Sequence, residues 1–262
     1  SHSLLVSEDR SRGYEQYKSL VKKSSDLMSY IFRYEDEFKY TGYIRQSKDK
    51  LMPVLCVHLG AILYHVAQVL TERHITIPST ITFSGMGAKY IHIISDNESD
   101  VQDIVKMLLS AFMESLSGDK CKMPKNFKVR FQNNAKEVTA QGAMLLNHIS
   151  LQDIRDYDKE PLCVFGIDKE ISDELKYEDV PQYKNDVLKS YDKFLDAFVR
   201  DKKITRFFKE EFGIIFTDEL VRKLENEASQ SFDLMSRNAN ADYVSETMFF
   251  WPLKNGLYAA SK

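Results

Sequence analysis

A long apolar run, Lys50 to His74, places the strongest limit on how this chain can fold. Written out it is KLMPVLCVHLGAILYHVAQVLTERH, with apolar residues on nearly every side of a helix. Such a helix must be buried in a protein core or in a membrane, and Pro53 is tolerable in its first turn. Its most apolar part, Val54 to Leu70, is short for a membrane span and carries two histidines. We therefore expect a core helix that other elements of the protein cover.

The next segment, Pro78 to Asp96, has the pattern of a strand, a glycine turn and the start of a helix. Its first part, STITFSG, is β-branched and aromatic and ends at Gly85, which predicts a strand covered on both faces with parallel neighbours. Without a Cβ at Gly85 and Gly87, the backbone of the turn can approach a flat base or a ribose closely. Free amides at the start of the following helix would favour a nearby anion. The same turn is also compatible with tight packing alone, so both interpretations stay open.

Further elements follow from the spacing of apolar residues and from turn and cap signals. The expected helices cover Ser11 to Phe38, residues 99–117 with Ser99 as the N-cap, residues 134–149, and two stretches after residue 180, the second following the N-cap candidate Thr217. The expected further strands cover Phe127 to Gln132 and residues 161–167. An apolar stripe from Tyr183 to Val199 must be covered by the chain or by a partner, and we favour packing within the chain. The apolar cluster around Trp251 should also pack down.

Composition and charge exclude several classes of protein. The 262 residues include 36 basic and 39 acidic side chains, mixed along the chain, for a net charge of -3. No strong field therefore favours nucleic acid or an anionic membrane. Cys56, Cys121 and Cys163 are far apart and lack the spacing of metal sites, so we expect free thiols in a reducing cytoplasm. His58 and His65 have no carboxylate beside them at ligand spacing, and we expect core histidines and no metal site.

The order of these elements resembles a known family. A buried helix, a strand, the glycine turn TFSGMGAKYIHII, a helix, a strand and the segment NNAKEVTAQGAMLL follow one another between Lys50 and Leu146. This succession is similar to the C-terminal lobe of the actin-like ATPase superfamily, which includes actin, sugar kinases and heat-shock chaperone ATPases. The resemblance implies an α/β fold over residues 1–180: a ribonuclease-H-like lobe, with a small mixed sheet flanked by helices. Residues 181–262 would form a helical C-terminal extension packed on that lobe.

The resemblance also implies a site for adenosine, with ATP or ADP as the bound cofactor. Gly85 and Gly87, with Met86 between them, would face the adenosine. Lys89 falls where the chaperones place a basic residue against the adenine. Ser84 would contact the ribose or only cap the helix that follows. These five residues are the candidate nucleotide site.

Other parts of the family's active site are not visible in this chain. A basic helix forms the second wall of the adenosine site in the family, so Lys18 and Lys22 are candidates for it, beside their interpretation as a solvated helix face. Asp168 follows an expected strand, but Lys169 and Glu170 replace the glycine and the hydroxyl residue that would wrap a phosphate. We therefore predict no catalytic residue. The chain would be the nucleotide-binding half of a longer actin-like or chaperone-like ATPase, with the N-terminal lobe of the same polypeptide as its partner.

Two alternatives belong to other functional classes. In the first, the chain is a helical scaffold that keeps the shape of the lobe without binding nucleotide. Its docking face for a protein partner or a second copy of the chain would be the stripe from Tyr183 to Val199. In the second, the chain belongs to a sugar-kinase-like enzyme, which would need the missing lobe even more.

Overall fold

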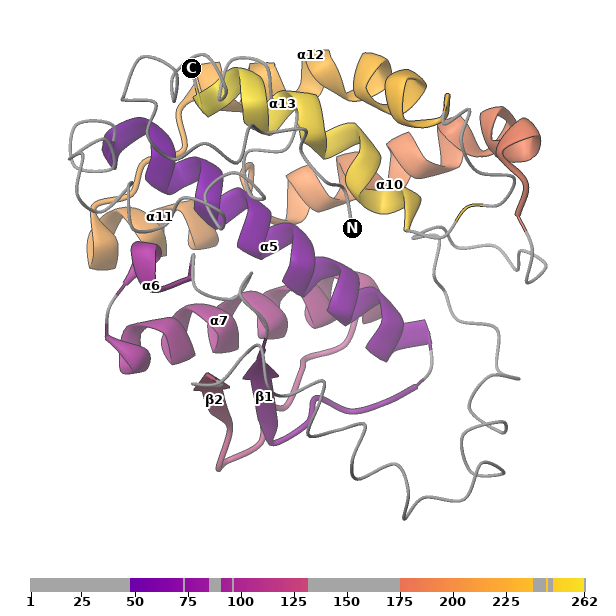
Figure 1. The fold of residues 1–262 in the computed structure, drawn as a ribbon. Coiled ribbons are helices and arrows are strands. Elements are labelled where there is room, and N and C mark those ends of the chain that lie inside the picture. Colours follow the sequence, from indigo (N-terminus) through magenta and orange to yellow (C-terminus); the bar gives the residue numbers. More distant parts are fainter. Residues whose placement is uncertain are drawn as a thin grey trace, which may run out of the picture.

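The computed structural model describes residues 48–72, 74–84, 91–95, 97–131, 175–237, 244 and 247–261 (Figure 1). Their elements, in chain order, are α5 (Lys48–Glu72), β1 (Thr80–Phe83), α6 (Ile91–Ile94), α7 (Glu98–Ser117), β2 (Lys128–Phe131), η3 (Tyr177–Tyr183), α10 (Lys184–Ala197), α11 (Lys202–Phe212), α12 (Asp218–Met235), η4 (Met248–Phe250) and α13 (Trp251–Ser261). The helices predicted over residues 11–38 and 134–149 and the strand predicted over residues 161–167 lie outside the described residues, as do Lys18 and Lys22.

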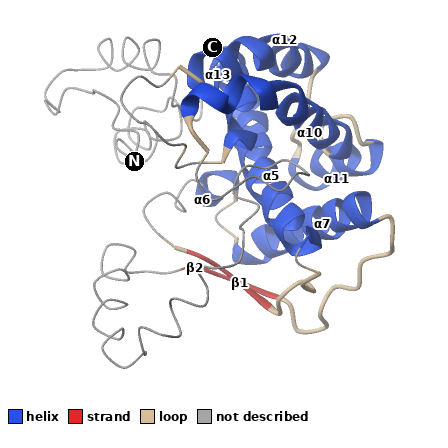
Figure 2. Cartoon of the chain, turned by 90° about the vertical axis from the view of Figure 1, so that its right-hand side faces the viewer, coloured by secondary structure: helices blue, strands red, loops and turns tan. Residues whose placement is uncertain are grey.

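The predicted α/β fold, a ribonuclease-H-like lobe with a small mixed sheet, is wrong. Helices contain 72% of the described residues. The described strands are β1 and β2, which have four residues each. The buried apolar side chains lie mainly on helices, so these helices pack on one another around α5 instead of flanking the faces of a sheet. Figure 2 shows the two strands at the margin of the helices. The described part of the chain is a helical body with one parallel strand pair attached to it.

The parallel direction of the strand pair agrees with the prediction from the sequence, but the burial of its two faces does not. β1 and β2 are parallel, with Thr80 opposite Lys128 and Phe83 opposite Phe131, which confirms the prediction of a parallel neighbour. Burial alternates along each strand, so that in β1 Ile81 and Phe83 are half-buried while Thr80 and Thr82 are exposed. The expectation of a strand covered on both faces is therefore wrong. One face of the pair packs toward the core and the other meets solvent.

Helix α5 is the centre of the core. Val54, Leu55 and Val57 are fully buried, and the ring of Tyr64 contacts Phe112 of α7 at 5.3 Å between centroids. Among the described helices, only the stretch Leu51–Glu72 is long and apolar enough to cross a membrane, with a mean hydropathy of 1.7. Of the 18-residue window with this hydropathy, 61% is buried inside the protein, as in the core helix of a globular domain. The observed burial agrees with the core helix expected from the sequence.

The C-terminal end of α7 agrees with the sequence, but its start does not. The C-terminal end is Gly118, at φ 75°, in the left-handed conformation that glycine adopts most readily. The N-cap is Asn97, not the predicted Ser99, because the Asn97 Oδ1 atom accepts a hydrogen bond from the Ser99 N–H at 3.0 Å. Asn97 Nδ2 and the Ser95 hydroxyl both donate to Asp100, at 2.9 and 2.8 Å. These bonds fix the helix start two residues earlier than the sequence suggested.

Helices α10 to α13 share one core with α5 and α7. In the stripe from Tyr183 to Val199, six side chains are buried within the chain: Val187, Tyr191, Phe194, Leu195, Phe198 and Val199. Phe194 contacts Tyr64 of α5 at 5.4 Å and Phe249 of η4 at 5.9 Å between ring centroids. The chain's own helices therefore cover this stripe, as packing within the chain requires.

The C-terminal helices α12 and α13 pack closely (Figure 1). The Ser231 hydroxyl of α12 donates to the Trp251 carbonyl oxygen and accepts from the Asn255 N–H, at 2.5 and 3.1 Å. The Trp251 ring is 1% exposed and stacks on Tyr177 at 6.1 Å between centroids. The predicted burial of the tryptophan cluster is confirmed, and Thr217 caps α12 as expected by accepting from the Leu220 N–H.

Candidate functional site

The structure describes the two flanks of the glycine turn but not its centre. Ser84 lies exposed at the end of β1. Gly85, Met86, Gly87 and Lys89 lie outside the described residues. Their predicted contacts with adenosine stay predictions, and what the structure contributes is the position of the residues at each end of the turn.

Both ends of the turn meet at one aromatic ring. Phe83, the last residue of β1, stacks on Phe131, the last residue of β2, with 5.6 Å between ring centroids and 17° between ring planes. His92 of α6, on the other side of the turn, lies 4.4 Å from the same ring at 47°. The described residues on both sides of the segment 85–90 therefore lie at the carboxyl edge of the strand pair.

The start of α7 is poorly suited to bind a phosphate. Anions bind at helix starts when backbone N–H groups are free and no like charge is near. Here the side chain of Asn97 accepts a hydrogen bond from the Ser99 N–H, and Glu98 and Asp100 place carboxylates in the first turn. An anionic group is therefore repelled from this helix start.

The exposed face of the strand pair is basic and polar. Lys128 and Arg130 of β2 stand opposite Thr80 and Thr82 of β1 in the parallel register, and all four residues are exposed. This face lies on the side away from the half-buried Phe83 and its neighbours. It offers hydroxyl and cationic groups at the surface.

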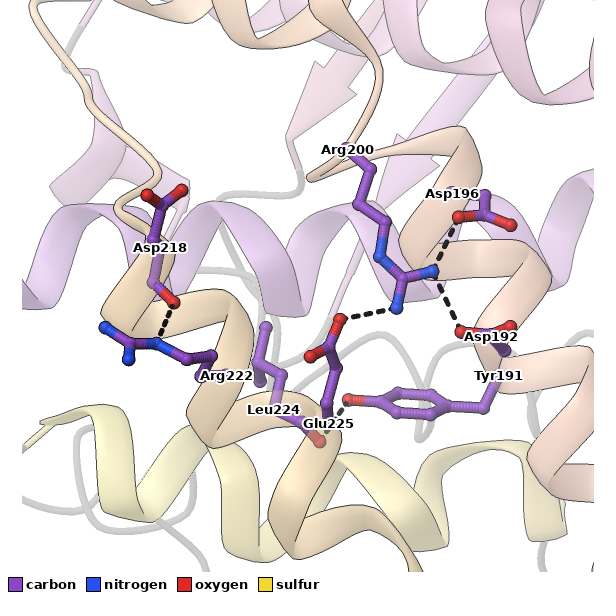
Figure 3. Close-up of polar contacts among 8 residues, drawn as sticks. All are labelled: Tyr191, Asp192, Asp196, Arg200, Asp218, Arg222, Leu224 and Glu225. Carbon is purple, nitrogen blue, oxygen red and sulfur yellow. Dashed lines mark hydrogen bonds and ion pairs between the residues drawn. The ribbon is translucent and has the colours of Figure 1, made fainter.

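A cluster of charges around Arg200 connects α10 to α12 (Figure 3). The Arg200 guanidinium donates to Asp192 at 2.9 Å, to Asp196 at 2.5 Å and to Glu225 at 2.5 Å. These three carboxylates raise the pKa of Arg200, with the bond to Glu225 as the main cause. Three carboxylates offset the charge of the guanidinium, and the cluster joins α10 to α12.

Tyr191 beside this cluster is a structural residue as well. Its hydroxyl donates to the Leu224 carbonyl oxygen of α12 at 3.3 Å (Figure 3). Burial raises the pKa of Tyr191 far above the ordinary value for a phenol. A hydroxyl that is buried, hydrogen-bonded and hard to ionise does not act as an acid or base near neutral pH.

The histidine and cysteine side chains of α5 serve the core. His65 stacks on Phe249 and contacts Gln68, whose side-chain amide donates to the Ser190 hydroxyl at 2.9 Å. Burial lowers the pKa of His65 and raises that of Cys56, so both side chains favour their neutral forms. Within the described part of the chain, no group of three or more metal-ligating side chains comes together.

A cleft that the sequence did not indicate lies between α7 and α11. Its volume is about 480 Å³, and its lining includes Met107, Met123 and Phe207. Charged side chains of both signs surround it, among them Lys106 and Glu211. Because these residues are far apart in the sequence, no local pattern could predict the cleft.

Comparisons of the chain with protein-family models, with curated proteins and with solved structures find no match. The resemblance to actin-like ATPases therefore depends on the sequence motifs alone. The support for a function therefore comes from the contacts of the described residues.

Proposed function

We propose that the chain binds the adenosine part of an adenine nucleotide at the turn that follows β1. The observation that carries the proposal is the contact of both flanks of this turn, Phe83 and His92, with the ring of Phe131. That contact brings the ends of a glycine-containing turn to the carboxyl edge of two parallel strands. Ligands of parallel sheets bind outside this edge.

The chemistry of the flanks favours adenosine over the phosphates as the bound part. Two glycines in the turn permit a close approach of the backbone to a flat group. The acidic first turn of α7 disfavours phosphates nearby. We therefore propose an adenosine-binding part of an ATPase whose phosphate contacts come from another lobe of the same polypeptide. On this proposal the chain does not hydrolyse ATP alone.

Replacing Gly87 with valine tests the proposal. A β-branched side chain occupies the space that a base or ribose needs and restricts the backbone of the turn. We expect ADP affinity, measured by isothermal titration calorimetry on the longest soluble form of the protein, to fall at least tenfold in this variant. The control is Gly118→Ala at the end of α7, which should bind ADP as the parent does.

Two outcomes would contradict this function. Equal ADP affinity of the parent and the Gly87→Val variant would place any nucleotide site elsewhere. Absence of saturable binding of ADP and ATP to the parent would remove nucleotide binding altogether. Circular dichroism of each variant must match the parent, so that a loss of binding is not a loss of fold.

A second candidate function is protein interaction through the cleft between α7 and α11. The observation that favours it is the partly exposed apolar lining by Met107, Met123 and Phe207. Flexible methionine side chains are frequent at surfaces that bind varied apolar partners. The same purified protein distinguishes the two functions. This candidate is favoured if the parent binds no ADP and if the Phe207→Glu substitution abolishes binding of a protein partner.

A further inference from the structure

A run of basic side chains leads into β2 and continues along it. Between residues 120 and 130 the chain carries five basic residues and no acidic one, although the protein has a net charge of -3. All five side chains are exposed, and together they are called the basic surface below: Lys120, Lys122, Lys125, Lys128 and Arg130. The local charge of this surface is therefore opposite in sign to the charge of the whole protein.

The residues between these five attach the segment to the core. Four of them pack in or against the hydrophobic core: Cys121, Met123, Phe127 and Val129. The Cys121 N–H donates to Oε1 of Glu114 on α7 at 3.3 Å. The Val129 N–H donates to Oε1 of Gln102 on α7, also at 3.3 Å. The Lys128 N–H donates to the Ser79 carbonyl oxygen at 2.9 Å. The basic side chains therefore extend to solvent from a backbone that is held at several points.

The charges of the basic surface are not neutralised within the described part of the chain. The five side chains form no hydrogen bond or ion pair with a described residue, whereas Arg200 and Lys184 are paired. The exposed Asp119 precedes the segment, and Glu114 is engaged by the Cys121 N–H. Unpaired cations on an anchored backbone attract an anionic partner and lose little conformational freedom when it binds.

We infer that the basic surface is a docking site for an extended, acidic segment of a partner protein. Lys128 and Arg130 are two residues apart on the exposed face of β2, so their backbone positions are about 7 Å apart. Side chains on one face of an extended peptide have the same spacing. Carboxylates at alternate positions of such a peptide would match the two cations. Thr80 and Thr82, opposite them on β1, add hydroxyl groups to the same face.

Two other kinds of anionic partner fit this surface less well. Proteins bind single-stranded nucleic acid by stacking its bases on aromatic rings, but Phe83 and Phe131 lie on the other, half-buried face of the strands. Binding to a membrane surface needs apolar side chains that enter the lipid, whereas threonines accompany the basic residues on the exposed face. The inference is independent of nucleotide binding at the turn after β1.

Fluorescence anisotropy on the whole protein tests the inference with a labelled peptide of alternating glutamate and threonine. The parent should bind this peptide saturably and should not bind a peptide with glutamine in place of glutamate. Lys128→Glu combined with Arg130→Glu should weaken binding about tenfold or more, because two attractions become repulsions. The matched control, Lys202→Glu with Lys209→Glu, makes the same change in net charge at exposed residues of α11, away from the strands (Figure 1). It should bind within about twofold of the parent, since salt screens distant charges.

Carbodiimide cross-linking locates the contact on the unaltered protein. This reagent joins a carboxylate to a lysine amine where the two groups meet. Mass spectrometry should find the acidic peptide joined to lysines of the basic surface, and high salt should suppress the product. Because no variant is needed, the measurement decides the question even if the double variant fails to fold.

Four results would overturn the inference. They are absence of binding of the acidic peptide to the parent, equal binding by a folded double variant, cross-links confined to lysines outside the basic surface, and tighter binding of another polyanion. The polyanions to compare at the same salt concentration are double-stranded DNA, single-stranded RNA and phosphatidylserine vesicles.

Discussion

Gly256→Leu is expected to abolish cooperative folding of the protein. A Cβ atom at Gly256 of α13 would lie 2.9 Å from the Leu224 Cα atom and 3.4 Å from the Lys223 carbonyl oxygen of α12. Both are backbone atoms, which cannot turn away as a side chain would. Any larger side chain must push the two helices apart and break the hydrogen bonds that Ser231 makes with α13.

A graded series separates this clash from other effects of losing a glycine. Gly256→Ala gains about 1 kcal/mol in helix propensity, yet it should lose a net 1–3 kcal/mol, roughly, because the helices must shift. Gly118→Ala is the control, since its φ of 75° strains an alanine while no atom lies within 4 Å of the added Cβ. That strain should cost about 1–2 kcal/mol without loss of folding. Urea unfolding followed by circular dichroism measures all three, and a Gly256→Leu variant as stable as the parent would contradict the observed helix packing.

Phe198→Ala should lower the free energy of unfolding by about 3–5 kcal/mol. The ring is fully buried and contacts Phe194 at 5.8 Å, Phe208 at 5.9 Å and Phe216 at 5.2 Å between centroids. Truncation leaves a cavity among aromatic rings that cannot collapse easily. The midpoint of thermal unfolding should fall on the order of 10 °C. Leu234→Ala, at a side chain that is 55% exposed, is the control and should have a small effect.

A substitution at Gly60 of α5 tests the packing of Phe198 independently. A Cβ at Gly60 would lie 3.0 Å from the Phe198 ring, so Gly60→Ala should destabilise the parent. In the Phe198→Ala background the same methyl group enters the new cavity, and Gly60→Ala should stabilise the protein. A double-mutant cycle measures this change of sign. Additive effects of the two substitutions would show that the residues do not touch.

Local signals in the sequence were sufficient to predict several elements. The apolar run around Val54 required a core helix, and Gly118 and Thr217 marked helix ends because glycine and threonine have specific backbone and capping roles. The cap at Asn97 was missed because Ser99 is also a good capping residue. Only the bonds of Asp100 to Ser95 and Asn97 decide between them.

The α/β fold class was implied by the family resemblance, whereas the error about the environment of β1 came from giving β-branched composition more importance than alternation. Thr80, Ile81, Thr82 and Phe83 alternate between polar and apolar residues, which is the pattern of a half-buried strand. Read in that way, the segment predicts one exposed face, as observed. A strand covered on both faces would have required apolar residues at the threonine positions.

The contacts of the candidate site could not be predicted from the sequence. Phe83 and Phe131 meet because the register of the parallel pair places them opposite each other. His92 joins them only because the chain after the glycine turn returns to that edge. No pattern within a short window carries such information, whereas the glycines of the turn are visible directly.

Photoaffinity labelling with 8-azido-ADP tests the central claim, adenosine binding at the turn after β1, most directly. The reactive group sits on the adenine, so it marks the residues that surround the base. We expect mass spectrometry to find the label in peptides that contain residues 84–94 or 128–131, with labelling suppressed by excess ADP. Label confined to other peptides, such as those of the α7–α11 cleft, or labelling that excess ADP does not suppress, would contradict the account.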